Sequence, residues 1–316
     1  MLWLGVAAGM SGPLAWAAPQ DSPSRDNSVV VLYPTAPSPE REVYGLIREA
    51  ITDTLREHRQ RTDERAAQSA LVPAALALKE AHPRAIISLG RIGYQVADAS
   101  DAGVPWIAGS LQVQDADIRG VHPPTAAVSL TPDPRSLLEG LKQLAPKITR
   151  ILVAYNPDHS ELYIEAARTA SRALKVSIVS LPAHDLREAS AHYYNILKYA
   201  NPETDALWLV EGDGLVDLEG TLPSMIQSAW AAHFVILSNI PEHARRGALL
   251  SAYPDPTALG RQLASLALAA LDGKPTGPLQ YGSSLVFVVN RRVASHLGLD
   301  TTALTRDHHA VLVGEQ

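Results

Sequence analysis

The most constraining feature of this sequence is an alternation between short apolar runs and longer amphipathic segments. Most of the short runs are apolar throughout and rich in β-branched residues, a pattern typical of parallel strands covered on both faces. The sequence therefore predicts an α/β fold. The expected strands are Val29–Tyr33, Ala85–Leu89, Val104–Ala108, Arg150–Tyr155, Val176–Leu181, Ala206–Val210, Phe234–Ser238, Ala248–Tyr253 and Leu285–Val289.

The segments between these runs repeat apolar residues every three or four positions, as amphipathic helices do. Residues 43–54, 137–144 and 259–270 show this period most clearly. A capping side chain stands before a proline at four places, and this pair favours a helix start because proline lacks the N–H that would go unused there. The four pairs are Ser38-Pro39, Asp133-Pro134, Asn156-Pro157 and Asp255-Pro256.

The chain is long enough for two lobes, since its 316 residues exceed one average domain. Residues 120–134 are rich in proline and contain only the short apolar piece Ala126–Leu130. We expect this stretch to cross between two α/β lobes, with a new helix–strand series from Asp133. Residues 272–278 form a second turn-rich stretch.

Composition excludes several classes of function. The net charge is −6 and no basic run exceeds two residues, which argues against nucleic-acid binding because that requires clustered Lys and Arg. Cysteine is absent, which removes disulfides, thiol nucleophiles, thiolate metal sites and a lipid-anchor cysteine.

The N-terminus predicts export. Residues 1–10 are apolar, and Ala15-Trp16-Ala17 has the small-x-small form of a cleavage site, although no Lys or Arg precedes the apolar run. We expect a signal peptide over 1–17 and an unstructured polar tail over 18–28, the alternative being an apolar N-terminus without structure. No other stretch reaches the ~20 apolar residues of a membrane span. The expected product is a periplasmic protein that is not membrane-inserted.

The sequence carries no motif of a known catalytic or cofactor site. It has no G-x-S-x-G elbow, and Gly273-Lys274-Pro275-Thr276 departs from the P-loop order. Glu211-Gly212-Asp213-Gly214 is no dinucleotide fingerprint, and no H-E-x-x-H occurs. His308-His309 is interpreted as a solvated pair in a polar C-terminal tail over 301–316. We predict no catalytic residue, no metal and no cofactor.

The candidate ligand residues are those that follow the carboxyl ends of the expected strands, where parallel sheets collect ligands. They offer hydroxyl, amide, acidic and aromatic groups, as small-ligand pockets do. These residues are Tyr33, Gly90, Arg91, Asn156, Ser160, Asp213, Asn239, Tyr253 and Asp255.

Each candidate also has a purely structural interpretation. Arg91 either clamps a carboxylate or is a solvated arginine in a first helical turn. Asn156 is a helix cap that also contacts ligand or a cap alone, and Ser160 donates to an anion or only occupies the first helical turn. Asp213 binds an ammonium group or caps a helix from Leu215. Tyr253 stacks on a ligand or closes the core at the hinge.

Several of these segments resemble a known family. The runs Arg150–Pro157, Asp205–Asp213 and Gly247–Tyr253, with Asp255 and Leu259-Gly260, resemble the substrate-binding components of ABC-type uptake systems. Gly273–Pro275, Val289-Asn290 and Ala294–Leu299 complete the pattern, so the resemblance covers Val29 to Leu299 and is strongest after Arg150.

The resemblance implies the type I periplasmic-binding fold, in which two Rossmann-like lobes with parallel sheets are joined by three crossover segments. The first lobe would hold 29–130 plus 254–275, and the second 131–253 plus 276–300. Some relatives bind aromatic amino acids such as tryptophan or tyrosine. The chain departs from the family's pattern at Gly214, at Pro256 and in the turn at Gly90-Arg91, which separates the expected fold from the expected specificity.

The predicted function is that of a monomeric periplasmic solute-binding protein that closes around a small molecule and delivers it to an ABC-type permease. The ligand would be an amino acid or a related small carboxylate. One alternative is a sensory or accessory protein of the same fold that docks on a membrane receptor without transport. A third is an α/β enzyme without a recognised motif.

Overall fold

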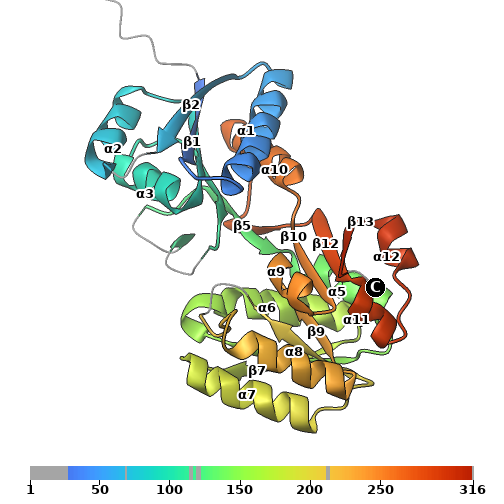
Figure 1. The fold of residues 1–316 in the computed structure, drawn as a ribbon. Coiled ribbons are helices and arrows are strands. Elements are labelled where there is room, and N and C mark those ends of the chain that lie inside the picture. Colours follow the sequence, from blue (N-terminus) through green and yellow to red (C-terminus); the bar gives the residue numbers. More distant parts are fainter. Residues whose placement is uncertain (1–27, 68–69, 114–116, 119–121, 211–213, 315–316) are drawn as a thin grey trace, which may run out of the picture.

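The computed structural model describes residues 28–67, 70–113, 117–118, 122–210 and 214–314. These residues form two α/β lobes, each built around one mostly parallel sheet (Figure 1). The predicted signal peptide over 1–17 and nearly all of the predicted tail over 18–28 lie outside the described residues. Ser28 is the exception, because it is buried at the start of the first strand.

The first lobe has a six-stranded sheet in the order β11-β5-β4-β3-β1-β2, and all of its pairings are parallel. Its strands are β1 (Ser28–Pro34), β2 (Arg61–Ala67), β3 (Ala85–Leu89), β4 (Trp106–Leu111), β5 (Ala126–Pro132) and β11 (Leu279–Gly282). Helices α1 (Glu40–Glu57) and α10 (Pro256–Leu271) cover one face, and α2 (Leu71–Glu80) and α3 (Gly90–Ser100) cover the other.

The second lobe has a seven-stranded sheet in the order β13-β12-β10-β9-β8-β6-β7. Its strands are β6 (Arg150–Tyr155), β7 (Ser177–Pro182), β8 (Asp205–Leu209), β9 (Val235–Ser238), β10 (Leu250–Pro254), β12 (Leu285–Asn290) and β13 (His309–Val313). One face packs against α5 (Pro134–Leu144), α6 (Pro157–Ala173), α11 (Arg291–His296) and α12 (Thr302–Asp307). The other face packs against α7 (Leu186–Tyr199) and α8 (Thr221–Ala232), and α9 (Pro241–Arg246) follows β9.

The continuous aliphatic runs form the cores of the two lobes, because a strand that is covered by helices on both faces of its sheet can bury every side chain. Strands β3, β4 and β8 are buried along their whole length. Trp208 on β8 and Trp106 on β4 are core residues.

Three of the four predicted helix caps are confirmed. The side chains of Asp133, Asn156 and Asp255 each accept a hydrogen bond from a backbone N–H in the first turn of the next helix. The prediction for Ser38 is wrong. The helix α1 begins at Glu40 with Pro39 at the N-cap position, so Ser38 lies one residue too early to cap it, and its hydroxyl donates to Glu42 Oε1 at 2.9 Å instead.

The chain crosses between the lobes three times, after β5, after β10 and after β11. Backbone hydrogen bonds hold the crossings together: Asp133 N–H donates to Gly282 O at 3.0 Å, and Asp255 N–H donates to Ser284 O at 2.8 Å. A Cβ at Gly282 would lie 2.6 Å from Pro254 Cβ, so glycine lets the third crossing pass close to the second. The crossings therefore form one hinge.

The sheets correct several expectations from the sequence. Ala126–Leu130 is part of strand β5 rather than a connecting piece. Strand β11 pairs with β5 in the first lobe, whereas the resemblance assigned residues from 276 onward to the second. Residues 301–316 are not a simple tail, since α12 and β13 lie within them and β13 pairs with β12. Strand β12 runs antiparallel to β10, so the second sheet is not parallel throughout.

Candidate functional site

The parallel strands of the two lobes point their carboxyl ends toward the hinge. β5 and β10 leave their sheets at these ends to cross into the other lobe, and the strands parallel to them end on the same side (Figure 1). The segments after β1, β3 and β4 of the first lobe therefore face the segments after β6, β8 and β9 of the second. Ligands of open parallel sheets bind at this edge.

In the first lobe, Tyr33 lies at the end of β1 and is partly buried. The guanidinium of Arg48, on α1, lies 3.7 Å from the centroid of its ring. Arg48 is itself fixed by Glu64 on β2, with Nε 2.9 Å from Oε2. One face of the Tyr33 ring is therefore covered by α1, and a ligand would meet the remaining surface of the side chain.

Gly90 begins α3 with a φ of +68°. A Cβ there would lie 2.9 Å from the hydroxyl oxygen of Tyr44, on α1, so a side chain would displace that hydroxyl. Burial raises the pKa of Tyr44, and a hydrogen bond with the Ser110 side chain lowers it in part. Ser110 has a positive φ of 54°, an unusual conformation for a residue other than glycine, at the end of β4. Sequence reasoning missed both Tyr44 and Ser110.

Arg91 matches neither of its two expected roles in a simple way. Its guanidinium makes a two-pronged ion pair with the buried carboxylate of Asp117, with Nη2 3.1 Å from Oδ2, and it also donates to Gln112 O at 3.1 Å. Arg91 is therefore not simply a solvated arginine. A carboxylate ligand at this position would compete with Asp117 for the guanidinium.

In the second lobe, Asn156 and Ser160 lie together at the start of α6, and both are buried. Asn156 Oδ1 accepts a hydrogen bond from Asp158 N–H at 3.0 Å, which satisfies a free donor of the first turn. The cap role of Asn156 is confirmed. Both side chains are placed by the helix start and not by a loop.

Asn239 directly follows β9 and is 1% exposed. Its Oδ1 accepts a hydrogen bond from Trp208 Nε1–H at 2.8 Å, which fixes the orientation of the amide. Its Nδ2 has no hydrogen-bond partner among the described residues. A buried amide donor without an acceptor costs free energy, on the order of 1–3 kcal/mol, unless an acceptor is brought to it.

An aromatic cluster connects Asn239 to the hinge. The ring of Tyr163, on α6, meets those of Trp208 and Tyr281 with centroids 5.4 Å apart in both pairs. The Tyr163 hydroxyl donates to Pro132 O at 3.0 Å, at the first crossing. Burial raises the pKa of Tyr281, on β11, to about 12, with a smaller contribution from Asp133. Sequence reasoning missed both tyrosines. Tyr281 lies just before the third crossing in sequence, whereas Tyr163 is 31 residues from Pro132 and gave no such signal.

Tyr253 and Asp255 lie at the second crossing. Asp255 caps α10 through Oδ1, at 2.8 Å from Ala258 N, and its Oδ2 lies 3.7 Å from His309 Nδ1. His309 thus lies near a hinge carboxylate, but its side chain is 67% exposed, so the interpretation as a solvated histidine agrees with the structure; only its placement in a tail is corrected, because His309 begins β13. Burial raises the pKa of Tyr253. Both candidates are placed at the hinge, as the structural interpretation of Tyr253 expected.

Asp213 lies outside the described residues. Its alternative role as the cap of a helix from Leu215 is wrong, because α8 begins at Thr221 with Gly220 at the N-cap position.

A buried polar group also packs behind Asn239. His243, on α9, is 1% exposed, and its Nδ1 lies 2.8 Å from Ser238 Oγ. Burial, and then the nearby charge of Arg246, lower the pKa of His243 to about 4, while Glu242 acts in the opposite direction. The imidazole is therefore neutral at neutral pH and orients the end of β9.

The described part of the chain offers neither a group of metal ligands nor a helix that could span a membrane. No group of three or more His, Asp or Glu side chains there could hold a metal ion. None of the described helices has the length and apolar character needed to cross a bilayer.

Comparison with known proteins identifies the fold. No protein-family model matches the chain, and no curated protein matches it by sequence. Among solved structures, the ligand-free, open structure of a substrate binding protein with adhesive properties from Clostridium difficile has a TM-score of 0.63 at 16% identity, covering 92% of this chain and 100% of that one. The chain has the fold of a substrate-binding protein.

Two further structures share this fold with the chain. The ABC domain in complex with L-Trp from Streptococcus pneumonia has a TM-score of 0.50 at 17% identity and covers 90% of this chain and 100% of its own. A periplasmic ribose ABC transporter from Conexibacter woesei has a TM-score of 0.50 at 16% identity, with 88% and 97% covered. The expected two-lobed α/β fold is thus confirmed.

Proposed function

We propose that this protein is an exported solute-binding protein that holds a small molecule between its two lobes and performs no chemistry on it. The observation that carries this proposal is the buried Nδ2 donor of Asn239 at the carboxyl end of β9, which has no partner among the described residues. It lies on the edge of the sheet that faces the other lobe, where a ligand acceptor can reach it. A carbonyl, carboxylate or hydroxyl oxygen of the ligand would satisfy it.

The second lobe would supply most of the polar contacts. Asn156 and Ser160 are held by the start of α6, and Asn239 by the end of β9. Asp213, which lies outside the described residues, is proposed as a further contact from its place in the sequence. Because rigid elements hold these groups, little conformational freedom would be lost when a ligand binds. The first lobe would close over them with Tyr33, Gly90 and Arg91.

Closure would occur by rotation at the hinge. The three bonded crossings let the lobes move as two bodies while each core stays intact. A ligand favours the closed form only if it contacts both lobes, because the shift equals the difference between its affinities for the two forms. Tyr253 and Asp255 would take up the motion at the second crossing.

The related structures support transport but not one ligand. One of them is a complex with L-Trp and another is a ribose transporter, so proteins of this fold take ligands of different chemistry. For this chain we propose an amino acid or related small carboxylate, delivered to an ABC-type permease from the periplasm by a monomer.

A thermal-shift screen of the protein from Ala18 onward tests the proposal, with amino acids, small carboxylates, sugars and nucleosides as ligands. A ligand at 100 times its dissociation constant adds about 2.7 kcal/mol to the free energy of unfolding. We expect a hit whose stabilisation falls by about half, to about 1.4 kcal/mol, in Asn239→Ala at the same ligand concentration. If no compound of any of these classes raised the unfolding temperature, the result would count against solute binding and favour the accessory role.

Small-angle scattering tests the motion separately. With the bound ligand, the radius of gyration should fall as the lobes close. A ligand that binds without any compaction would overturn the hinge mechanism while leaving ligand binding intact.

A further inference from the structure

A second cavity lies on the second lobe, away from the residues proposed to hold the solute. It has a volume of about 660 Å³ and is formed by α8, the end of α9, the start of α11 and Gly314. None of the candidate ligand residues lines it. We refer to it as the arginine cavity, because Arg245, Arg246 and Arg292 are among the described residues that line it and no Asp or Glu is.

The three arginines differ in how well their charges are paired. The Arg246 guanidinium has three acceptors: the carboxylates of Glu219 at 2.9 Å and Glu242 at 3.1 Å, and Leu218 O at 2.9 Å. Arg245 reaches only Glu242, at 3.9 Å, and shares this carboxylate with Arg246.

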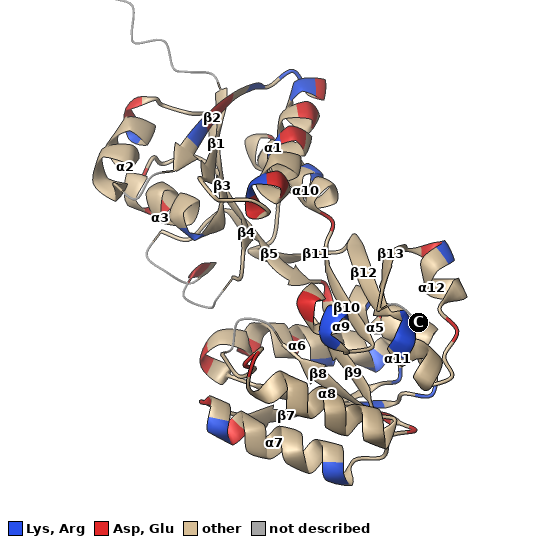
Figure 2. Ribbon diagram, in the orientation of Figure 1, with Lys and Arg blue, Asp and Glu red and all other residues tan. Residues whose placement is uncertain are grey.

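Arg292 has no carboxylate partner among the described residues. Figure 2 shows basic residues on both α9 and α11, the two elements that bring Arg245 and Arg292 to one cavity. The cavity thus presents guanidinium donors that the described part of the protein does not use.

The remaining wall of the cavity is largely apolar, with Gln227 and Asn290 as its polar members, and the Asn290 amide is already bonded to Ala244 O and Val293 N–H. Leu222, Pro223 and Ile226 of α8 contribute aliphatic surface, and Trp230 an aromatic ring. The Trp230 ring stacks on His296 with centroids 3.8 Å apart and planes at 8°. The Arg292 guanidinium lies 5.0 Å from the centroid of the same ring. Trp230 and Arg292 therefore support each other at the wall.

We propose that the arginine cavity is a second binding site, specific for an organic anion with a carboxylate on an apolar aromatic body. A guanidinium matches a carboxylate in a two-pronged hydrogen bond, and the α8 wall matches the body. The volume lies within the range of small-molecule sites, about 300–1,000 Å³.

Another cavity of similar size on this lobe is less suited to an anion, because its charged lining residues are of both signs. It has a volume of about 740 Å³, yet Lys147, Glu203 and Asp300 all line it, so it offers no excess of positive charge. The arginine cavity combines its apolar wall with cations alone among its described lining residues.

Binding of 2-naphthoate tests the site, with 2-naphthylmethanol as the neutral probe of nearly the same shape. Titration by calorimetry gives the affinities, and the NMR signal of the Trp230 indole N–H reports the location. We expect 2-naphthoate to bind at least about tenfold more tightly than the alcohol. Arg292→Ala should remove this preference, and Arg291→Ala is the matched control because Arg291 is adjacent but does not line the cavity.

Several results would overturn the proposal. These are no binding of 2-naphthoate at millimolar concentration, equal affinity for the two probes, or equal loss in Arg291→Ala and Arg292→Ala. Binding that Asn239→Ala abolishes and Arg292→Ala leaves intact would place the probe between the lobes and also overturn it. Arg292 is exposed, so its variant should fold, and an unchanged unfolding midpoint would verify this.

Discussion

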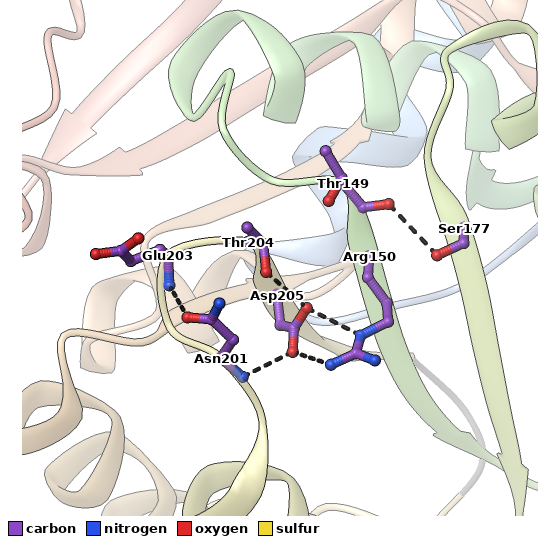
Figure 3. A network of polar contacts seen from close by, with 7 residues as sticks. All are labelled: Thr149, Arg150, Ser177, Asn201, Glu203, Thr204 and Asp205. Carbon is purple, nitrogen blue, oxygen red and sulfur yellow. Dashed lines mark hydrogen bonds and ion pairs between the residues drawn. The ribbon is translucent and has the colours of Figure 1, made fainter.

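The buried polar groups at the two ends of the second sheet differ in how fully they are hydrogen-bonded. At the end away from the hinge, Asp205 is 1% exposed and accepts hydrogen bonds from Arg150, Asn201 N–H and Thr204 (Figure 3). At the hinge end, Asn239 is equally buried, and its Nδ2 donor has no partner in the part of the chain that the structure describes. The first arrangement stabilises the fold, and the second keeps hydrogen-bonding capacity for a ligand. Paired and unpaired polar groups thus separate a structural end from a binding end.

The network of Asp205 explains this stability in detail. Burial alone would raise the pKa of Asp205, but the hydrogen bonds from Arg150, Asn201 N–H and Thr204, together with the charge of Arg150, hold that pKa below its ordinary value. Arg150 Nε lies 2.9 Å from Oδ1, and Asn201 N lies 2.8 Å from Oδ2. The carboxylate thus joins β6, β8 and the turn before β8.

The largest expected effect is the loss of this network. Asp205→Ala should lower the free energy of unfolding by about 3 kcal/mol, because several donors lose a charged acceptor. Since the pKa is depressed in the fold, this contribution is present above the unfolded pKa of the carboxyl and is lost as the pH falls through the folded value. Urea unfolding at pH 7 measures the change.

A surface pair provides the control for Asp205. Asp53 pairs with Arg56 across one turn of α1, with both side chains largely exposed. Asp53→Ala should therefore cost less than about 0.5 kcal/mol. Equal losses for the two variants would show that the buried network of Asp205 adds no more stability than a surface ion pair.

The second effect is a dependence of stability on pH that arises at the hinge end. His243 has a pKa of about 4 in the fold and an ordinary value of 6.5, so it stays neutral when folded and gains a proton on unfolding. Its contribution is complete above pH 6.5 and is lost as the pH falls from there through about 4. Between pH 7.5 and pH 5 the loss should be about 2 kcal/mol.

The variant His243→Asn isolates this titration. Asparagine can keep a polar contact with Ser238 but takes up no proton, so the slope of stability between pH 7.5 and pH 5 should become shallower than in the parent protein. Thermal unfolding across this range measures both slopes. An identical slope in the two proteins would show that His243 is protonated in the fold.

The third effect is on the ligand more than on the fold. Asn239→Ala should weaken the binding of the solute found in the thermal-shift screen by about tenfold, because the substitution removes the Nδ2 donor. The free energy of unfolding should change by about 1 kcal/mol at most, since an unpaired buried donor disappears together with the acceptor of Trp208. Calorimetry and urea unfolding measure the two quantities.

This variant is the sharpest test of the comparison. Asp205→Ala should lower stability and leave the solute affinity of the folded protein unchanged, while Asn239→Ala should do the reverse. If Asn239→Ala instead lowered stability as much as Asp205→Ala without weakening the solute, the hinge end would be structural as well.

The smallest effect concerns the link between the aromatic cluster and the hinge. Tyr163→Phe keeps the ring contacts but removes the hydrogen bond to Pro132 O. The free energy of unfolding should fall by about 1 kcal/mol or less. The radius of gyration of the ligand-free protein tests whether this bond also holds the lobes apart, and an unchanged value would limit Tyr163 to packing.

Much of the fold could be predicted because its strongest signals are local. Continuous apolar runs marked the central strands β3, β6 and β8, and capping residues before proline marked the starts of α5, α6 and α10. The edge strands were harder to predict. β2 has the sequence RTDERAA and lies at the edge of its sheet, where one side faces solvent and polar side chains are tolerated.

The sequence by itself determined the α/β class, the central strands, most helix starts and the edge of each sheet where polar groups collect. These follow from burial periodicity and from backbone donors at helix starts, which act over a few residues. Only the tertiary structure decided that β11 and β13 join different sheets, that Arg91 pairs with Asp117, and that Asn239 keeps a free donor. The physical reason is distance along the chain: Asp117 is 26 residues from Arg91, and Trp208 is 31 from Asn239. A side chain's partner at such a separation depends on how the helices and strands pack within each lobe.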